Sequence, residues 1–360
     1  MSSNYKAHNS LLMTKKVIEA HNSILDLVGN TPLIRLHKTV DGFLGSYYAK
    51  AEFANPGHSN KDRIALHIIK EAERKNIIKP GDTIIETTSG NTGFSIAMAS
   101  IIKGYKCILA VSSKSSPDKI DMLRAMGATV YVCPGNMKAN DPRSYYQVAK
   151  RLHNEIKGSI YINQYFNELN TDAHFRTTGP EIWKQTAGQI THLVAASGTG
   201  GTISGIGRYL KSKNPNIKII GVDAYGSVLK KFHETSEFDE NEIYPYRIEG
   251  LGKNLIPSTT HFEYIDHFEK VTDEESAHAA REITKKEGIF VGYTSGAALQ
   301  ATRQLNQQQL FFDKNSFVVI IFCDHGTRYM SKIYSDQWMK EQGFFDANHL
   351  QDEKAIEYIK

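Results

Sequence analysis

Short apolar segments alternate with helical segments along most of the 360-residue chain, and this alternation restricts the fold more than any other feature. The runs "TIIET" (83–87), "KCILAV" (106–111) and "FVVIIF" (317–322) are typical of strands buried on both faces. Successive parallel strands need a crossover between them, usually a helix. We therefore expect an α/β protein whose mostly parallel sheets are covered by helices on both faces.

The pattern predicts individual elements along most of the chain. Strands are expected at 83–87, 106–111, 129–133, 159–163, 191–197, 217–223 and 317–322. Helices are expected at 61–75, 94–105, 117–126, 144–156, 178–186, 202–212, 273–287, 295–306 and 326–342. Residues 225–260 are expected to be irregular, with "SEFDENEIYPY" as an acidic surface loop. A chain of this length usually divides into two domains.

Composition excludes several classes of protein. The charge balance, 43 − 39 = +4, includes no dense basic run, so we expect no nucleic-acid partner. The longest apolar run, "FVVIIFC", is far too short to span a membrane, and the N-terminus lacks a signal-peptide core. The three cysteines are isolated, which argues against a metal site and favours reduced thiols in a cytoplasmic protein.

A glycine-rich loop, "SGTGGTISGIGRYLK" (197–211), follows a predicted strand and begins a predicted helix. Backbone N–H groups at such a helix start bind phosphate. A dinucleotide fingerprint would need glycine at position 203, which is Ile203, and a P-loop would need Gly-Lys-Ser/Thr, which is missing. The sequence therefore predicts a phosphate-binding loop of another type; the alternative is a tight turn whose glycines serve packing.

Two further loops of small residues, "TTSGNTGF" (87–94) and "GYTSGAAL" (292–299), join predicted strands to helices. In "NPGHSNKDRI" (55–64), Ser59 is the expected N-cap, and Lys61 begins a helix, where the macrodipole favours anions. Ligands of open α/β sheets bind at the carboxyl ends of the strands. A ligand that needs a phosphate cradle, a reactive lysine and a carboxylate pocket is pyridoxal phosphate with an amino-acid substrate.

These motifs resemble the fold-type II pyridoxal-phosphate enzymes, most closely the branch of cysteine synthase and cystathionine β-synthase. The resemblance covers residues 24–345 and includes, in family order, "VGNTPLIRL", "NPGHSNKDRI", "TSGNTG", "QYFNELN", "TTGPEIW", "SGTGGTISG", "EGLG" and "GYTSGAA". It implies a tryptophan synthase β-like fold with two domains, each containing a mostly parallel twisted sheet. The implied parts are an N-terminal arm (1–20), a smaller mobile domain (55–167), a larger domain (21–54 and 168–345) and a polar tail (346–360).

The resemblance also implies residue roles. Lys61 corresponds to the catalytic lysine that forms a Schiff base with the cofactor, Asn91 to the residue that bonds its 3-hydroxyl group, and Thr294 to the hydroxyl facing its pyridine nitrogen. The residues that correspond to the phosphate loop are Gly198, Thr199, Gly200, Gly201 and Thr202. The residues that correspond to the substrate-binding site are Thr88, Ser89, Thr92, Gln164, Tyr165, Glu249 and Gly250.

The implied reaction is β-replacement on serine or an activated serine by a thiol, through an aminoacrylate. Tyr165, "YRIEGLG" and "YSDQWMKEQGF" resemble cystathionine β-synthase, which joins serine to homocysteine, although Lys253 stands where the animal enzymes carry an aromatic residue. The alternatives are a cysteine synthase using O-acetylserine and sulfide, a phosphoserine-dependent synthase, and a non-catalytic scaffold on the same fold. We expect small amino acids and a thiol as ligands, and a homodimer as the assembly.

Overall fold

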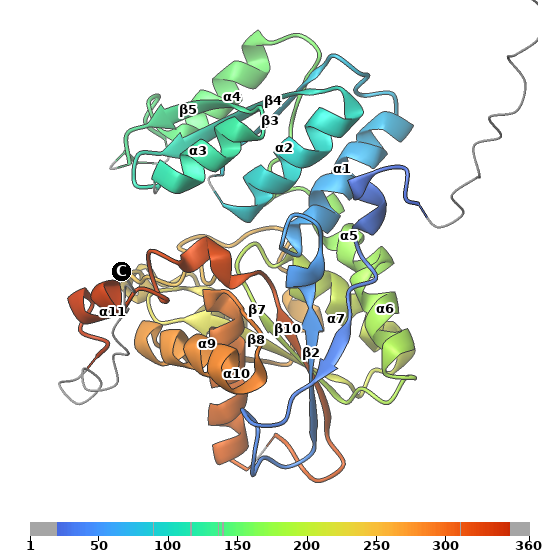
Figure 1. Ribbon diagram of the computed structural model, residues 1–360, viewed down its shortest axis with the longest axis vertical. Helices are drawn as coiled ribbons and strands as arrows, with labels where there is room; N and C mark the ends of the chain where they lie inside the picture. Colours follow the sequence, from blue (N-terminus) through green and yellow to red (C-terminus); the bar gives the residue numbers. More distant parts are fainter. Residues whose placement is uncertain are drawn as a thin grey trace, which may run out of the picture.

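The computed structural model describes residues 20–88, 90–115, 117–135, 137–138, 140–309 and 311–345, and contains two sheets flanked by helices (Figure 1). The larger sheet has the strand order β1-β2-β10-β7-β8-β9, and the smaller has the order β5-β4-β3-β6. Every strand pair is parallel except β1 with β2. The predicted fold class is therefore confirmed. All but residue 20 of the expected arm, and the whole expected tail, lie outside the described residues.

The larger sheet combines an early segment of the chain with its later half. Its strands are β1 (Leu33–Arg35), β2 (Ser46–Ala51), β7 (His192–Ala196), β8 (Lys218–Ala224), β9 (His267–Val271) and β10 (Phe317–Phe322). Successive residues of β10 enter two different cores: Val318 and Ile320 join one apolar cluster, and Val319 and Ile321 join the other. Both faces of the strand are thus buried, which explains its continuous apolar sequence.

The smaller sheet consists of β3 (Thr83–Glu86), β4 (Lys106–Ser112), β5 (Thr129–Cys133) and β6 (Ser159–Tyr161). Along β4, Leu109 packs in the cluster that includes residues of α1 and α2, and Ala110 packs in the cluster that includes residues of α4. This sheet is also covered on both faces (Figure 1). The distribution of strands between two sheets supports the proposed division into domains at 55–167 and at 21–54 with 168–345, which stays a prediction.

The helices follow the predicted order with three corrections, the first of which is a helix at Leu169–Arg176 that the sequence pattern did not predict. They are α1 (Lys61–Arg74), α2 (Asn91–Lys103), α3 (Pro117–Ala125), α4 (Tyr145–Glu155), α5 (Leu169–Arg176), α6 (Thr178–Gln185), α7 (Gly201–Lys213), α8 (Leu229–Thr235), α9 (Asp273–Glu287), α10 (Tyr293–Gln307) and α11 (Asp336–Glu341), with short 3₁₀ turns η1 (Ile24–Leu27), η2 (Glu52–Ala54), η3 (Glu240–Glu242), η4 (Phe262–Tyr264) and η5 (Gly326–Tyr329). Residues 225–260 are not wholly irregular, because they contain α8. The single helix predicted at 326–342 is wrong: Ser335 accepts a hydrogen bond from the Trp338 N–H group and begins a separate helix.

A buried cluster of charges ties the start of α1 to the larger sheet. The Arg63 guanidinium contacts the Glu52 carboxylate at 2.6 Å and the Glu181 carboxylate at 2.6 Å, and Lys50 contacts Glu181 at 2.7 Å. Lys50 and Glu52 have no exposed side-chain surface. Because buried ions need such partners, this cluster fixes the orientation of α1, whose first residue is Lys61.

Candidate functional site

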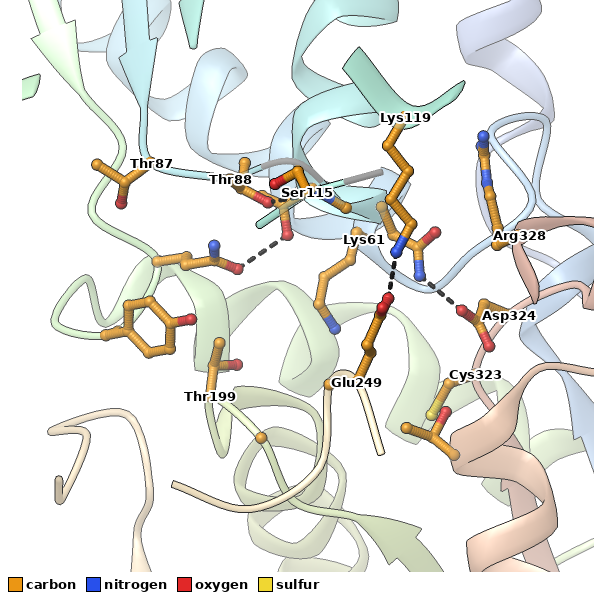
Figure 2. A pocket seen from close by; sticks show the side chains of 18 of the residues that line it. Lys61, Thr87, Thr88, Ser115, Lys119, Thr199, Glu249, Cys323, Asp324 and Arg328 are labelled. Carbon is orange, nitrogen blue, oxygen red and sulfur yellow. Dashed lines mark hydrogen bonds and ion pairs between the residues drawn. The ribbon is translucent and has the colours of Figure 1, made fainter. Parts of the chain in front are cut away.

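A cavity of about 480 Å³ lies where the carboxyl ends of strands from both sheets meet. Its lining includes Thr87 after β3, Ser112 at the end of β4, Ala196 at the end of β7 and Cys323 after β10. Lys61 points into the middle of this space, with Thr199 on one side and Asp324 on the other (Figure 2). The topology therefore brings the predicted loops together at the sheet edges where ligands of α/β proteins bind.

The loop before α7 forms a tight cradle on the cavity wall. A Cβ atom on Gly198 would lie 2.2 Å from the Gly250 carbonyl oxygen, and one on Gly200, which has φ +85°, would lie 2.0 Å from Thr260 Oγ1. These positions therefore require glycine. The first N–H groups of α7 have no acceptors within the helix, so they are free to bind an anion beside Gly198, Thr199 and Gly200.

Side chains behind the cradle hold its two threonines. The Asn170 amide donates to Thr199 Oγ1 at 3.0 Å, and the Asn60 amide donates to Thr202 Oγ1 at 3.1 Å. Gly201 does not line the cavity; a Cβ atom there would lie 2.2 Å from the Asn170 side chain. This loop is consequently shaped by packing on one side and open to the cavity on the other.

Lys61 is half-buried at the start of α1, and no carboxylate among the described residues lies within salt-bridge distance of its amine. Its Nζ donates to Asn60 Oδ1 at 3.0 Å. Burial lowers the pKa of Lys61, and the neighbouring Lys253 acts in the same direction, whereas Asp324 opposes the change. The neutral, nucleophilic form of this amine is therefore more accessible than that of an exposed lysine. The N-cap of α1 is Asn60 and not the predicted Ser59, whose hydroxyl nevertheless accepts from the Lys61 N–H group at 3.3 Å.

Asp324 is a buried residue of the site that the sequence interpretation missed. Its Oδ2 atom accepts from the Asn91 amide at 2.7 Å and from the Tyr329 hydroxyl at 2.8 Å. Burial raises the pKa of Asp324. Nearby, Thr294 is buried against Cys323, and burial raises the pKa of that thiol to about 12, which leaves it protonated. Asn91 is thus held at the start of α2 by a group from the other sheet.

The loop after β3 meets Gln164 on the same cavity wall. The Thr92 hydroxyl donates to Gln164 Oε1 at 2.8 Å, and the Thr88 hydroxyl accepts from the Gly90 N–H group at 3.2 Å. The backbone N–H group of Gln164 donates to the buried Glu86 carboxylate at 3.2 Å. Thr88, Thr92 and Gln164 all line the cavity, whereas the predicted Ser89 lies outside the described residues.

Glu249 forms a bridge across the rim of the cavity. Its carboxylate pairs with Lys119 of α3 and with Lys332, which follows η5 (Figure 2 draws the first pair). These lysines hold the pKa of Glu249 below its ordinary value although burial opposes them. Glu249 and Gly250 both line the cavity, and no local motif indicates the two lysine partners of Glu249.

The remaining predicted residue, Tyr165, lines the cavity beside Lys253. His58, which also stands close to Lys61 in sequence, does not line the cavity; its ring lies 5.2 Å from the His325 ring, measured between centroids. Among the described residues, no group of three His, Cys, Asp or Glu side chains could hold a metal ion. In the same part of the chain, no helix is both long and apolar enough to cross a membrane.

The fold and the site define an enzyme class: a two-sheet α/β protein with a phosphate cradle and a reactive lysine facing one cavity. Pyridoxal phosphate fits these residues, because the glycine cradle suits its phosphate and the half-buried Lys61 amine suits its aldehyde. The chain matches the family "pyridoxal-phosphate dependent enzyme" over residues 24–324. It belongs to that family, and its cofactor is pyridoxal phosphate.

Several relatives are known by activity. The chain is 45% identical over 323 residues to the cystathionine β-synthase of Apis mellifera, covering 89% of this chain and 63% of that protein. It is 34% identical over 338 residues to cysteine synthase 1 of Emericella nidulans, covering 93% of this chain and 90% of that protein. A solved structure, a hydrogen sulfide-producing enzyme from Fusobacterium nucleatum, superposes with a TM-score of 0.79 at 33% identity and covers 89% of this chain and 99% of that one. The chain thus spans about three fifths of the animal cystathionine β-synthases it matches.

Proposed function

We propose that this protein is a cystathionine β-synthase that replaces the β-hydroxyl group of serine with the thiol of homocysteine. The observation that carries the proposal is the 45% identity to the honeybee cystathionine β-synthase, against 34% to a fungal cysteine synthase.

Different residues of this chain would bind different groups of the cofactor. Gly198, Thr199, Gly200 and Thr202, supported by Gly201, receive the phosphate through backbone N–H groups and hydroxyls. Asn91, fixed by Asp324, would bond the 3-hydroxyl group, and Thr294 would offer its hydroxyl to the pyridine nitrogen. When bound, pyridoxal phosphate withdraws electrons from the Cα atom of an attached amino acid.

The donor amino acid is held by its carboxylate. Thr88, Thr92 and Gln164 line the cavity and would hold that carboxylate, with the Thr92 hydroxyl already oriented by Gln164. Ser89 is proposed to assist them because it belongs to the same motif. The Lys61 amine would take the Cα proton of the donor at Nζ, because burial lowers its pKa and makes the neutral base more accessible. A rotation of the smaller domain, 55–167, would close this pocket over the substrate and exclude water.

Product analysis tests the proposal directly. Purified protein with pyridoxal phosphate is given serine, O-acetylserine or O-phosphoserine, each with homocysteine or sulfide, and the products are identified by mass. Cystathionine from serine and homocysteine should form with the highest kcat/KM. If O-acetylserine with sulfide is favoured by orders of magnitude, the protein is a cysteine synthase, the function of its fungal relative.

The role of Lys61 has its own experiment. Borohydride reduction should fix the cofactor covalently to Lys61 in the wild-type protein, and peptide mapping should locate the label there. Lys61→Ala should stay folded, as judged by circular dichroism, and take up no label. A label on any other lysine would refute the assignment. Absence of any label in the wild-type protein would favour a non-catalytic scaffold.

We further propose a cytoplasmic homodimer. Cys107 and Cys133 are buried free thiols, which agrees with a reducing compartment. Sedimentation equilibrium of the purified protein tests the assembly: a mass near twice 40.4 kDa is expected, and a mass of a single chain at micromolar concentration would contradict it.

A further inference from the structure

Lys253 is a charged side chain in the cavity that neither the cofactor nor the donor pocket uses. It lines the cavity on the loop that also carries Gly250, and no described carboxylate lies within salt-bridge distance of its amine. Two other lysines near the cavity, Lys119 and Lys332, pair with Glu249, whereas Lys61 is the residue assigned to the cofactor. A half-buried ammonium group without a counterion is costly, and an anionic ligand would remove that cost.

The backbone of Lys253 is fixed on both sides. Its N–H group donates to Ser227 Oγ at 2.8 Å, and its carbonyl oxygen accepts from the Val228 N–H group at 2.9 Å. One residue earlier, the Gly252 N–H group donates to the Ser197 carbonyl oxygen at 2.8 Å, which connects this loop to the start of the phosphate cradle. Lys253 therefore has a defined position relative to the bound cofactor.

The side chain is directed by an aromatic face. The Lys253 amine lies 5.0 Å from the centroid of the Tyr165 ring, which is a cation–π distance. Tyr165 follows Gln164, the residue that bonds Thr92 in the donor pocket. Lys253 thus lies beside the donor pocket, on a loop that belongs to the larger-sheet part of the cavity lining.

We propose that Lys253 binds the carboxylate of the acceptor thiol and so selects an amino-acid thiol over sulfide. This inference rests on the proposed function and specifies how its second substrate is recognised. Sulfide has no carboxylate, so it cannot form the oriented, charge-assisted hydrogen bonds through which Lys253 would hold an amino-acid thiol. Homocysteine has one, and the ammonium–carboxylate contact orients its thiol toward the β-carbon of the donor.

The test compares thiols with and without a carboxylate, with serine at saturation. Lys253→Met should raise the KM for homocysteine and for 3-mercaptopropionate about tenfold to a hundredfold. It should leave the KM for sulfide and 2-mercaptoethanol unchanged, with kcat at saturating thiol largely retained. Lys253→Arg should restore most of the homocysteine affinity. The matched control is Lys114→Met, because Lys114 is an exposed lysine on another part of the cavity lining.

A binding measurement separates recognition from turnover. Calorimetric titration of the holoenzyme with cystathionine should show a dissociation constant at least tenfold weaker for Lys253→Met, and unchanged for Lys114→Met. The proposal is overturned if wild type and Lys253→Met have equal dissociation constants, or if Lys114→Met weakens cystathionine binding instead. It is also overturned if Lys253→Met loses the absorbance of the bound cofactor. If wild type forms no cystathionine at all, the proposed function fails; if it forms cystathionine with a KM that Lys253→Met leaves unchanged, only this inference fails.

Discussion

The buried pair of Glu52 and Arg63 offers a quantitative prediction, in which Glu52→Gln keeps the shape of the side chain and removes its charge. Glu52 is fully buried, and Arg63 contacts both of its oxygens, at 2.6 and 2.7 Å. The substitution leaves part of the Arg63 charge without its partner. Breaking a buried ion pair from one side costs about 3–5 kcal/mol of unfolding free energy.

The pKa of Glu52 gives a second estimate. Burial alone would raise this pKa, but Arg63 and Lys50 hold it at about 2, compared with 4.5 for an ordinary glutamate. That difference corresponds to about 3 kcal/mol. Because folding lowers the pKa, the stabilisation is fully present above about pH 4.5 and is lost as the pH falls toward 2. The two estimates agree on about 3 kcal/mol at pH 7.

Urea unfolding followed by circular dichroism measures the effect. At pH 7, Glu52→Gln should unfold at a clearly lower urea concentration than wild type, and the difference should shrink by about 1 kcal/mol or more at pH 3.5. Glu71→Gln is the control, because Glu71 pairs with Arg74 at the surface and should change little. A stability difference for Glu52→Gln below about 0.5 kcal/mol at pH 7, a typical surface effect, would refute the reasoning, as would a difference that does not depend on pH.

Three further predictions concern the cavity. Gly200→Leu should abolish cofactor retention after dialysis, while Gly81→Leu, also at positive φ but in open space, should retain it; full retention by Gly200→Leu would place the phosphate elsewhere. Tyr165→Phe should lower kcat/KM for homocysteine relative to sulfide about fivefold, because one hydroxyl contact contributes about 1 kcal/mol. An unchanged ratio would exclude a contact between that hydroxyl and homocysteine. Glu249→Gln removes the charge between two lysines, so amide hydrogen exchange in α3 should accelerate while α7 stays unchanged; equal rates in wild type and variant would show that the bridge does not stabilise α3.

The fold was largely predictable because its central strands are apolar on both faces. Residues 317–322 have the predicted limits, since a continuous apolar run buried on both faces has few other structures available. Residues 129–133 also have the predicted limits, although this strand lies at the edge of the smaller sheet and is mostly exposed. Strand β2 was missed for the opposite reason: its sequence, SYYAKA, contains Lys50, which sequence reasoning places in solvent. In the structure Lys50 is buried by Glu181 and Gln185, partners that are distant in sequence.

The site was predictable where a local motif carries the chemistry and less so where partners meet across the cavity. The cradle at 198–202 and Lys61 belong to short motifs. Asp324 follows the apolar strand at 317–322, so the rule that ligands bind at carboxyl ends of strands could have identified it. The lysine partners of Glu249 come from 119 and 332, and only the three-dimensional arrangement of the two sheets brings them together.

The position of β10 in the larger sheet has a consequence for biosynthesis. This strand, Phe317–Phe322, pairs with β2 on one side and with β7 on the other, so it fills the centre of a sheet whose other strands precede it in sequence. While the ribosome is still adding residues before 317, β2 and β7 have no shared neighbour and expose open, apolar edges. Completion of the larger sheet must therefore wait until β10 has left the exit tunnel. Because Cys323 and Asp324 follow β10 directly, the cavity is assembled at that same late step, so cofactor cannot be captured co-translationally before it.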